Sequence, residues 1–301
     1  MTKMAVIGFG LIGGSMALSW KQAGLVDEVI ACGHREESLK LAKEMGAADS
    51  WTTSIPEAVK DADIVVVAVP VQAMEKVFSD LADYLKPSAV VTDVGSTRVT
   101  VIEAARKGLK EKFRQYAPGH PIAGGELPGV AYATKDLFND KWVISTPTDE
   151  MDPEKVKFIE DAWTKAGAKI KVMSPELHDA IFASVSHLPH VLAYALVDMI
   201  TKEKYAKEKL GMAGAGFRDF TRIAASSPAM WRDICLSNRT AISKELKRYR
   251  QELEELQEAI DNSDAQKLEA CFENAMKNRR GLVFSASKQD LGKDDGRSKS
   301  H

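Results

Sequence analysis

The sequence has little cysteine and almost no excess of charge. Its 301 residues include three cysteines, Cys32, Cys235 and Cys271, which lie far apart in the chain. This spacing argues against a disulfide framework or a cysteine metal cluster, and it favours a reducing, cytoplasmic location. The formal net charge of −2 argues against a broad basic surface for nucleic acid.

Long apolar runs and metal-ligating patterns are also missing. We expect no segment to reach the length of a membrane span, and the apolar start at 4–7 is too short for a signal peptide. The six histidines include no HExxH arrangement, so no metal site is expected. Hydrophobic residues nevertheless make up 45% of the chain, which is enough for a globular protein with well-filled cores.

The first half of the chain alternates short apolar runs with helical patterns. The expected strands are 4–7, 29–31, 64–69, 89–92, 142–144 and 169–172. The expected helices are 11–23, 36–45, 71–85, 98–109 and 153–166. The run 64–69 has no polar alternation, which indicates a strand covered on both faces. The alternation predicts an α/β fold, a doubly wound parallel sheet of Rossmann type, over residues 1–173.

Strand signals nearly vanish after about residue 174. The expected helices are 175–202, 206–225, 228–261 and 264–280. These predict an all-α helical domain over residues 174–284. The polar residues 285–301 predict a disordered tail.

One of these helices carries an apolar seam. Its members alternate spacings of four and three residues, as in the a and d positions of a coiled coil. They are Ile242, Leu246, Tyr249, Leu253, Leu256 and Ile260. The seam either packs on its own domain or is shared with a second subunit.

A glycine loop, Gly8–Gly13, follows the first apolar strand and opens a helix. Its first glycine permits a tight turn, its second lets the backbone approach a pyrophosphate, and its third lets helix and strand pack closely. The helix N-terminus presents N–H groups to the phosphates. We therefore expect a dinucleotide here. The candidate contacts are Gly8, Gly10, Leu11, Ile12, Gly13, Val69 and Pro70.

The end of the second strand carries His34 and Arg35, where an NAD-binding fold usually has Asp or Glu. A carboxylate there would repel a 2′-phosphate, whereas an arginine pairs with it through charged hydrogen bonds. We therefore expect NADP, with NAD as the alternative. In that alternative, Arg35 is a solvated surface residue and Glu36 or Glu37 bonds the ribose.

Two polar positions in the first half suggest chemistry. Ser96 follows the strand 89–92, and ligands in open α/β sheets bind at such strand ends. The alternative role for Ser96 is an N-cap for the next helix. His120 lies in a segment rich in Gly and Pro, and histidine suits proton abstraction near neutral pH. The alternative is a merely structural histidine.

Two pairs in the second half have a spacing of three residues. His187 and His190 could share one helix face, although a metal would need further ligands, which are not evident. Asp219 and Arg222 form either a surface ion pair or a site in which Arg222 clamps a substrate carboxylate through two hydrogen bonds.

Taken together, these motifs resemble the family of TyrA-type prephenate and arogenate dehydrogenases. The segments that carry the resemblance are GFGLIGGS at 8–15, DVGS at 93–96, GHPIAG at 119–124, SHLPH at 186–190 and FRDFTR at 217–222. The resemblance covers about residues 4–284. It implies a Rossmann domain followed by a helical dimerisation domain, so it favours a homodimer and a shared seam.

The resemblance also implies an activity, the oxidative decarboxylation of a cyclohexadienol in tyrosine biosynthesis. The 4-hydroxyl proton goes to a base, the C4 hydride goes to the nicotinamide, and the ring carboxylate leaves as CO2. By motif position, His120 is the acceptor for the 4-hydroxyl and Ser96 is its helper. Arg222 binds the ring carboxylate, and His187 lies near the substrate side chain. Glu126 and Asp219 match polar positions at the site entrance.

One departure and two competing interpretations remain. Gly125 stands where many family members carry a hydroxyl residue, which leaves prephenate and arogenate both open as substrates. A related hydroxyacid or imine oxidoreductase would generally centre on a catalytic lysine in its helical domain. A dinucleotide-sensing module that is not an enzyme would have no evident need for His120, Ser96 and Arg222 together.

Overall fold

The computed structural model describes residues 1–125 and 127–282. The chain forms one compact unit over Met1–Glu245 and a second that begins at Leu246. The boundary predicted at residue 173 falls inside the first unit and stays a prediction. Glu126 and the predicted tail 285–301 lie outside the described residues.

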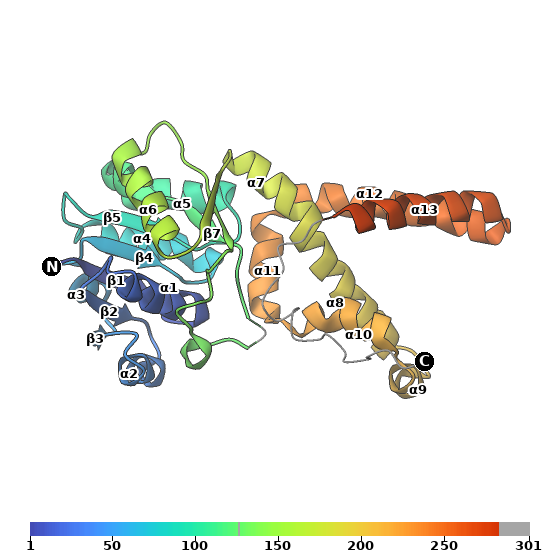
Figure 1. The fold of residues 1–301 in the computed structure, drawn as a ribbon, viewed down its shortest axis with the longest axis horizontal. Coiled ribbons are helices and arrows are strands. Elements are labelled where there is room, and N and C mark those ends of the chain that lie inside the picture. The colour runs from blue at the N-terminus through green and yellow to red at the C-terminus, as the bar shows by residue number, and fades with distance from the viewer. Residues whose placement is uncertain (126, 283–301) are drawn as a thin grey trace, which may run out of the picture. The chain divides into compact units, whose positions relative to one another are not determined.

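A six-stranded parallel sheet forms the centre of the first unit, in the order β3-β2-β1-β4-β5-β6 (Figure 1). Its strands are β1 Lys3–Ile7, β2 Glu28–Cys32, β3 Ser50–Thr52, β4 Ile64–Val67, β5 Val90–Asp93 and β6 Tyr116–Ala117. β4 and β5 are buried along their whole length, because helices cover both faces of a parallel sheet. The strand order reverses between β1 and β4, and ligands bind at such a switch point. The predicted Rossmann-type fold is confirmed.

Five α-helices connect these strands, and a sixth follows later in the chain and contacts β6. They are α1 Leu11–Gln22, α2 Glu36–Glu44, α3 Ile55–Val59, α4 Met74–Ala82, α5 Val99–Leu109 and α6 Pro153–Lys165. The helix predicted over 71–85 is shorter, because residues Val71–Ala73 after Pro70 form a 3-10 turn before α4 begins. β3, β6 and α3 were not predicted, since each is too short to show a periodic pattern.

A second sheet holds the segment around His120. It consists of β7 Gly119–Pro121, β8 Trp142–Ser145 and β9 Lys169–Val172, with β7 antiparallel to β8. The prediction that β8 and β9 belong to the parallel sheet was therefore wrong. His120 lies on a strand, where it pairs with Ile144, and this strand was missed because glycine and proline flank the histidine.

Helices make up the rest of the described chain. They are α7 Pro175–Phe182, the π-helical turn Ala183–His187, α8 Leu188–Thr201, α9 Ala206–Gly211, α10 Ala215–Thr221, α11 Pro228–Ser237, α12 Arg239–Asp261 and α13 Ala265–Gly281. Proline at the first turn and a capping serine start both α7 and α11. The helices predicted over 206–225 and 228–261 are each interrupted.

The continuous helical stretch Pro175–Thr201 is long and apolar enough to cross a membrane, judged by length and composition only. This corrects the expectation that no segment reaches that length. The same criterion is met by helices packed inside proteins. Two polar residues of the stretch, His178 and Asp179, are buried and hydrogen-bonded to other protein groups.

Candidate active site

The glycine loop has the geometry that a pyrophosphate requires. Gly8 has φ +93°, and a Cβ there would lie 2.5 Å from the carbonyl oxygen of Ala68. A Cβ on Gly13 would lie 2.6 Å from the Gly8 oxygen, so this glycine permits the close packing of α1. Among the described residues, apart from its chain neighbours, none would lie within 4 Å of a Cβ on Gly10. The open space lies at the start of α1, whose first N–H groups lack helical acceptors, so the loop fits a dinucleotide.

The other predicted cofactor contacts follow neighbouring strands at the same sheet edge. Val69 and Pro70 follow Ala68 after the end of β4, and a Cβ on Gly8 would lie 2.8 Å from a Val69 methyl carbon. His34 and Arg35 follow β2 and are both exposed. The carboxyl ends of these parallel strands lie together, so the structure gathers the predicted contacts at one edge.

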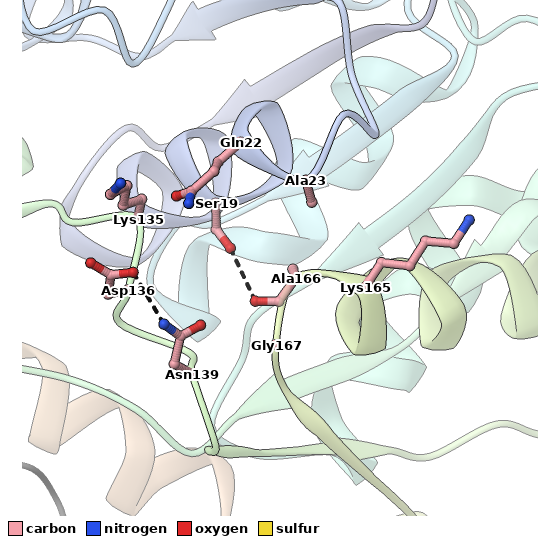
Figure 2. A pocket seen from close by; sticks show the side chains of 9 residues that line it. All are labelled: Ser19, Gln22, Ala23, Lys135, Asp136, Asn139, Lys165, Ala166 and Gly167. Carbon is pink, nitrogen blue, oxygen red and sulfur yellow. Dashed lines mark hydrogen bonds between the residues drawn. The ribbon is translucent and has the colours of Figure 1, made fainter.

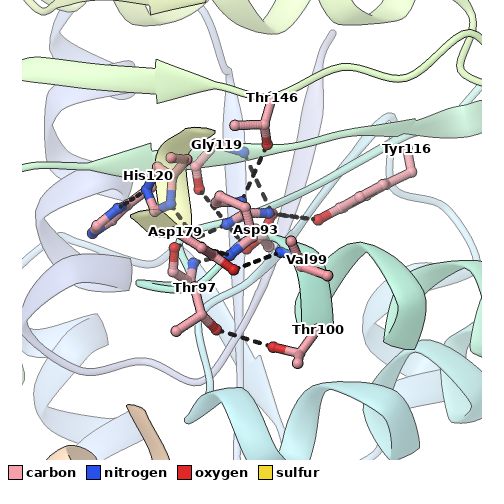
Figure 3. Close-up of polar contacts among 12 residues, drawn as sticks. Asp93, Thr97, Val99, Thr100, Tyr116, Gly119, His120, Thr146 and Asp179 are labelled. Carbon is pink, nitrogen blue, oxygen red and sulfur yellow. Dashed lines mark hydrogen bonds and ion pairs between the residues drawn. The ribbon is translucent and has the colours of Figure 1, made fainter. Parts of the chain in front are cut away.

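His120 is the first member of a buried chain of hydrogen bonds (Figure 3). Its Nδ1 lies 2.8 Å from Nε2 of His178, and Nδ1 of His178 lies 2.8 Å from Oδ1 of Asp179. The Asp179 carboxylate also accepts hydrogen bonds from the backbone N–H groups of Arg98 at 2.7 Å and Val99 at 3.0 Å. Strand β7, helix α7 and the start of α5 are thereby joined.

These bonds assign the protons on the two imidazoles. Because a carboxylate only accepts, Nδ1 of His178 carries a proton. Burial lowers the pKa of His178, so its Nε2 carries no proton and accepts from Nδ1–H of His120. Nε2 of His120 is then left as an acceptor. Burial holds the pKa of His120 well below 6.5, and the positive charge of Arg98 lowers it further. The imidazole of His120 is therefore neutral near neutral pH and offers a lone pair.

Sequence reasoning missed three members of this cluster, His178, Asp179 and Phe182. The ring of Phe182 stacks on His178 at 4.4 Å and lies 5.1 Å from His120, so it shields both imidazoles from water. Adjacent ionisable residues in an otherwise apolar helix were the available signal, because such groups are buried only when they are paired.

His187 belongs to the same buried region. It is 1% exposed, and its Nδ1 lies 3.2 Å from the amide nitrogen of Asn238, which also donates to the Asp179 carbonyl oxygen at 2.8 Å. Burial lowers the pKa of His187 to about 4. His187 is therefore a neutral, anchored side chain.

His190 is less buried and has different partners. Its Nδ1 lies 2.9 Å from the Ser186 carbonyl oxygen, and its ring stacks on Trp231. Within residues 1–125 and 127–282, no group of three or more His, Cys, Asp or Glu could hold a metal ion.

Arg222 lies on the 3-10 turn Arg222–Ala225 that follows α10, and it is exposed. Burial lowers the pKa of His190, and the nearby charge of Arg222 lowers it further. The predicted carboxylate clamp is thus close to His190, whereas His187 is enclosed. Asp219 is an exposed residue of α10.

Ser96 is half-buried between β5 and α5. Its alternative role as an N-cap was wrong, because the N-cap residue of α5 is Arg98, which has no side-chain cap. The Asp179 carboxylate satisfies the first N–H groups of α5 instead. The Ser96 hydroxyl is therefore not needed for capping.

A separate hollow of about 280 Å³ lies by the C-terminal end of α1 (Figure 2). It is lined by Ser19, Gln22, Ala23, Lys135, Asp136, Asn139, Lys165, Ala166 and Gly167. None of these residues belongs to the glycine loop or to the histidine cluster. The hollow is therefore not part of the candidate active site.

Comparison with known proteins identifies the family. Residues 16–172 match the family model described as prephenate dehydrogenase, nucleotide-binding domain, and residues 174–274 match prephenate dehydrogenase, dimerization domain. The cyclohexadienyl dehydrogenase of Zymomonas mobilis is 36% identical over 282 residues, which are 93% of this chain and 95% of the relative. The prephenate dehydrogenase of Bacillus subtilis is 35% identical over 91% of this chain and 74% of its own length.

Solved structures agree with these relatives. The structure of prephenate dehydrogenase from Aquifex aeolicus in complex with hydroxyphenyl propionate and NAD+ has a TM-score of 0.86 and 34% identity, covering 94% of this chain and 99% of that chain. The arogenate dehydrogenase of Synechocystis has a TM-score of 0.78 and 28% identity, covering 94% of this chain and 100% of that chain. With both family domains matched in order, this chain belongs to the prephenate dehydrogenase family.

Proposed function

We propose that this protein catalyses the NAD(P)-dependent oxidative decarboxylation of prephenate, arogenate or both, in tyrosine biosynthesis. The observation that carries the proposal is the bond chain from His120 through His178 to Asp179, which leaves an imidazole acceptor. Gly119 N donates to Asp93 at the end of β5, so the acceptor lies at the carboxyl edge of the sheet. The glycine loop follows β1 at the same edge.

In this mechanism, Nε2 of His120 accepts the proton of the substrate 4-hydroxyl as the C4–H bond breaks. The nicotinamide, when bound, supplies an acceptor for the C4 hydride. The bond from the ring to its carboxylate breaks, CO2 leaves, and the electron pair of that bond completes the aromatic ring. His178 and the Asp179 carboxylate stabilise the positive charge that develops on His120, because they accept its hydrogen bond in sequence. Ser96 is the proposed second contact for the 4-hydroxyl.

Arg222 is the proposed clamp for the ring carboxylate, because its guanidinium matches a carboxylate through two hydrogen bonds. His190 lies near Arg222 and is proposed to line the same part of the site. His187 is buried, and it is proposed to lie near the substrate side chain. Asp219 and Glu126 are proposed at the entrance.

NADP is the proposed cofactor, with NAD as the alternative. His34 and Arg35 are exposed where β2 ends, and the nearest acidic residue, Glu36, pairs with Lys40 at 3.2 Å. We expect Arg35→Ala to lower the preference for NADP over NAD by about 10-fold or more, since charged hydrogen bonds contribute about 1.5–3 kcal/mol. Lys43→Ala, an exposed change on α2, the helix that follows Arg35, is the control. An unaltered cofactor ratio in Arg35→Ala would refute this assignment.

A homodimer is proposed through the helical domain. The part of the seam that is exposed in the structure includes Leu246, Tyr249, Leu253 and Ile260, so the described residues of the chain leave most of the seam uncovered. The family model matched by residues 174–274 is described as a dimerization domain. Both observations favour the interpretation in which the seam is shared with a second subunit.

The experiment that tests the function is a two-by-two assay with prephenate or arogenate and with NAD or NADP. Absorbance of the reduced nicotinamide and release of CO2 are measured together. We expect equal amounts of both products with at least one substrate, and faster turnover with NADP. An absence of turnover in all four combinations, from protein that still binds dinucleotide, would overturn the proposal.

A further inference from the structure

Arg98 is a fully buried arginine that the mechanism above does not use. Its side chain is 0% exposed, and it pairs with the equally buried Asp93. Two parallel hydrogen bonds of 2.8 Å join the guanidinium to both carboxylate oxygens. Removing two charges from water costs several kcal/mol per ion unless further hydrogen bonds compensate.

The remaining donors of the guanidinium are all satisfied. Nη1 also donates to the carbonyl oxygens of Gly95 at 2.9 Å and Gly119 at 3.3 Å. Nη2 donates to the Tyr116 hydroxyl at 3.0 Å, and Nε donates to the Thr146 hydroxyl at 3.3 Å. The planar guanidinium thus spans β5, β6, β7 and the residue after β8, a reach that one ammonium group does not have.

Two of these partners stand next to the proposed catalytic groups. Gly95 precedes Ser96, and Gly119 precedes His120. The backbone N–H of Arg98 itself donates to Asp179, the carboxylate that ends the histidine chain (Figure 3). A single residue is therefore bonded to every segment that carries a proposed proton-transfer group.

We propose that Arg98 is a positioning residue that holds Ser96, His120 and the Asp179 carboxylate in register for proton transfer. This inference rests on the proposed function. Misplacement of a reacting group by about 1 Å costs on the order of 100-fold in rate, so an anchor common to three segments has a large effect on turnover. An ion pair that served only the fold would instead affect stability and cofactor binding together with the rate.

The substitution Arg98→Lys tests the proposal. Lysine keeps the positive charge beside Asp93 but does not reach both carbonyl oxygens and Thr146 together. We expect kcat to fall about 10–100-fold, while the KM for substrate and the Kd for dinucleotide stay within about twofold of the unmodified protein. The matched control is Arg106→Lys, the same change at an exposed arginine of α5 that pairs with Glu150, and it should leave kcat unchanged.

A second readout does not depend on activity. Nitrogen-15 shifts of the histidine rings report which ring nitrogen carries the proton. In the unmodified protein we expect protonated Nδ1 and unprotonated Nε2 on both His120 and His178, whereas Arg98→Lys should mix the two tautomers. If the unmodified protein turns over no substrate, the proposed function fails while this readout still tests the positioning role.

Two results would overturn the positioning role. One is an Arg98→Lys protein with unchanged kcat and unchanged tautomers. The other is a loss of kcat that is matched by an equal loss of dinucleotide affinity. If Arg98→Lys does not fold, the double variant Tyr116→Phe/Thr146→Val replaces it, because it removes two anchors of the guanidinium and keeps its pairing with Asp93. The double variant should also lose kcat, by about 3–10-fold, without a change in dinucleotide affinity. An unchanged kcat would overturn the proposal.

Discussion

The burial of apolar side chains differs between residues 3–172 and residues 175–245. The first region buries large side chains such as Trp20, Phe78 and Trp163 in one continuous core. The second region leaves many apolar side chains exposed, among them Val185 at 66% and Met212 at 86%. Contiguous exposed apolar surface marks interaction sites. The first region therefore folds around its own core, whereas the exposed apolar side chains of the second are consistent with the proposed second subunit.

The two regions also divide the chemistry. The glycine loop and its neighbouring strand ends lie wholly in the first region, so the proposed dinucleotide site is local to it. The proposed proton transfer involves both regions, because His120 of the first region bonds to His178 of the second. Changes in either region should therefore affect turnover, whereas only changes in the first should affect cofactor affinity.

The largest effect is expected for His120→Asn, because this change removes the proposed imidazole acceptor, which lies in the first region. A positioned base contributes about 100–10,000-fold to the rate, so kcat should fall by that factor. The Kd for dinucleotide, measured by fluorescence titration, should stay within about twofold. Full activity in His120→Asn would contradict the proposed role of His120. A parallel loss of dinucleotide binding would contradict the proposal that cofactor binding does not depend on the proton-transfer residues.

The substitution Leu253→Glu tests whether a second copy covers the exposed seam. Burial of a leucine side chain contributes about 1.5–3 kcal/mol, and a symmetric dimer contains the change twice. We therefore expect the dimer dissociation constant to rise by at least about 100-fold, as measured by sedimentation. Gln251→Glu adds the same charge at an exposed position of the same helix outside the seam and should leave the dimer intact. Equal behaviour of the two variants would show that the seam is not the interface.

A smaller and more selective effect is expected for Arg222→Ala in the second region. Loss of a charged hydrogen bond to the ring carboxylate costs about 1.5–3 kcal/mol, which predicts a rise of about 10–100-fold in the KM for substrate. The KM for dinucleotide should not change. Arg218→Ala, an exposed change on the neighbouring α10, is the control. If the KM for substrate rose equally in both variants, the effect would be one of surface charge and not of a clamp.

The last prediction concerns stability and not turnover, and it is a pH dependence that arises where the two regions meet. Burial lowers the pKa values of His120 and His178, and it lowers that of His187 from 6.5 to about 4. Below about pH 6.5 the unfolded chain therefore takes up protons that the folded protein does not. The free energy of unfolding should fall as the pH is lowered from 6.5 towards 4, by roughly 3 kcal/mol for His187 alone.

Urea unfolding at a series of pH values measures this slope. His187→Gln keeps an acceptor for Asn238 but does not titrate, so its unfolding free energy should depend less steeply on pH. An identical slope in the two proteins would show that His187 does not stay neutral in the folded state.

The sequence predicted the features that depend on a few adjacent residues. The GxGxxG loop predicted a tight turn followed by a helix, and the uniform apolar run at 64–69 indicated a buried parallel strand. The sequence did not predict β7, because the segment Gly-His-Pro has no β pattern of its own and forms a strand only by pairing with β8. It also left open a capping role for Ser96, which the structure gives to the Asp179 carboxylate of α7.

What the sequence by itself determined is the Rossmann-type sheet, the dinucleotide loop and the identity of His120 as a candidate base, since each follows from local periodicity, local turn geometry or side-chain chemistry. Only the tertiary structure decided how that base is held. His120 and His178 are 58 residues apart in the chain, and Arg98 and Asp179 are 81 apart. Hydrogen bonds of about 2.8 Å between such residues depend on how β7, α5 and α7 pack together, and no local pattern encodes that packing.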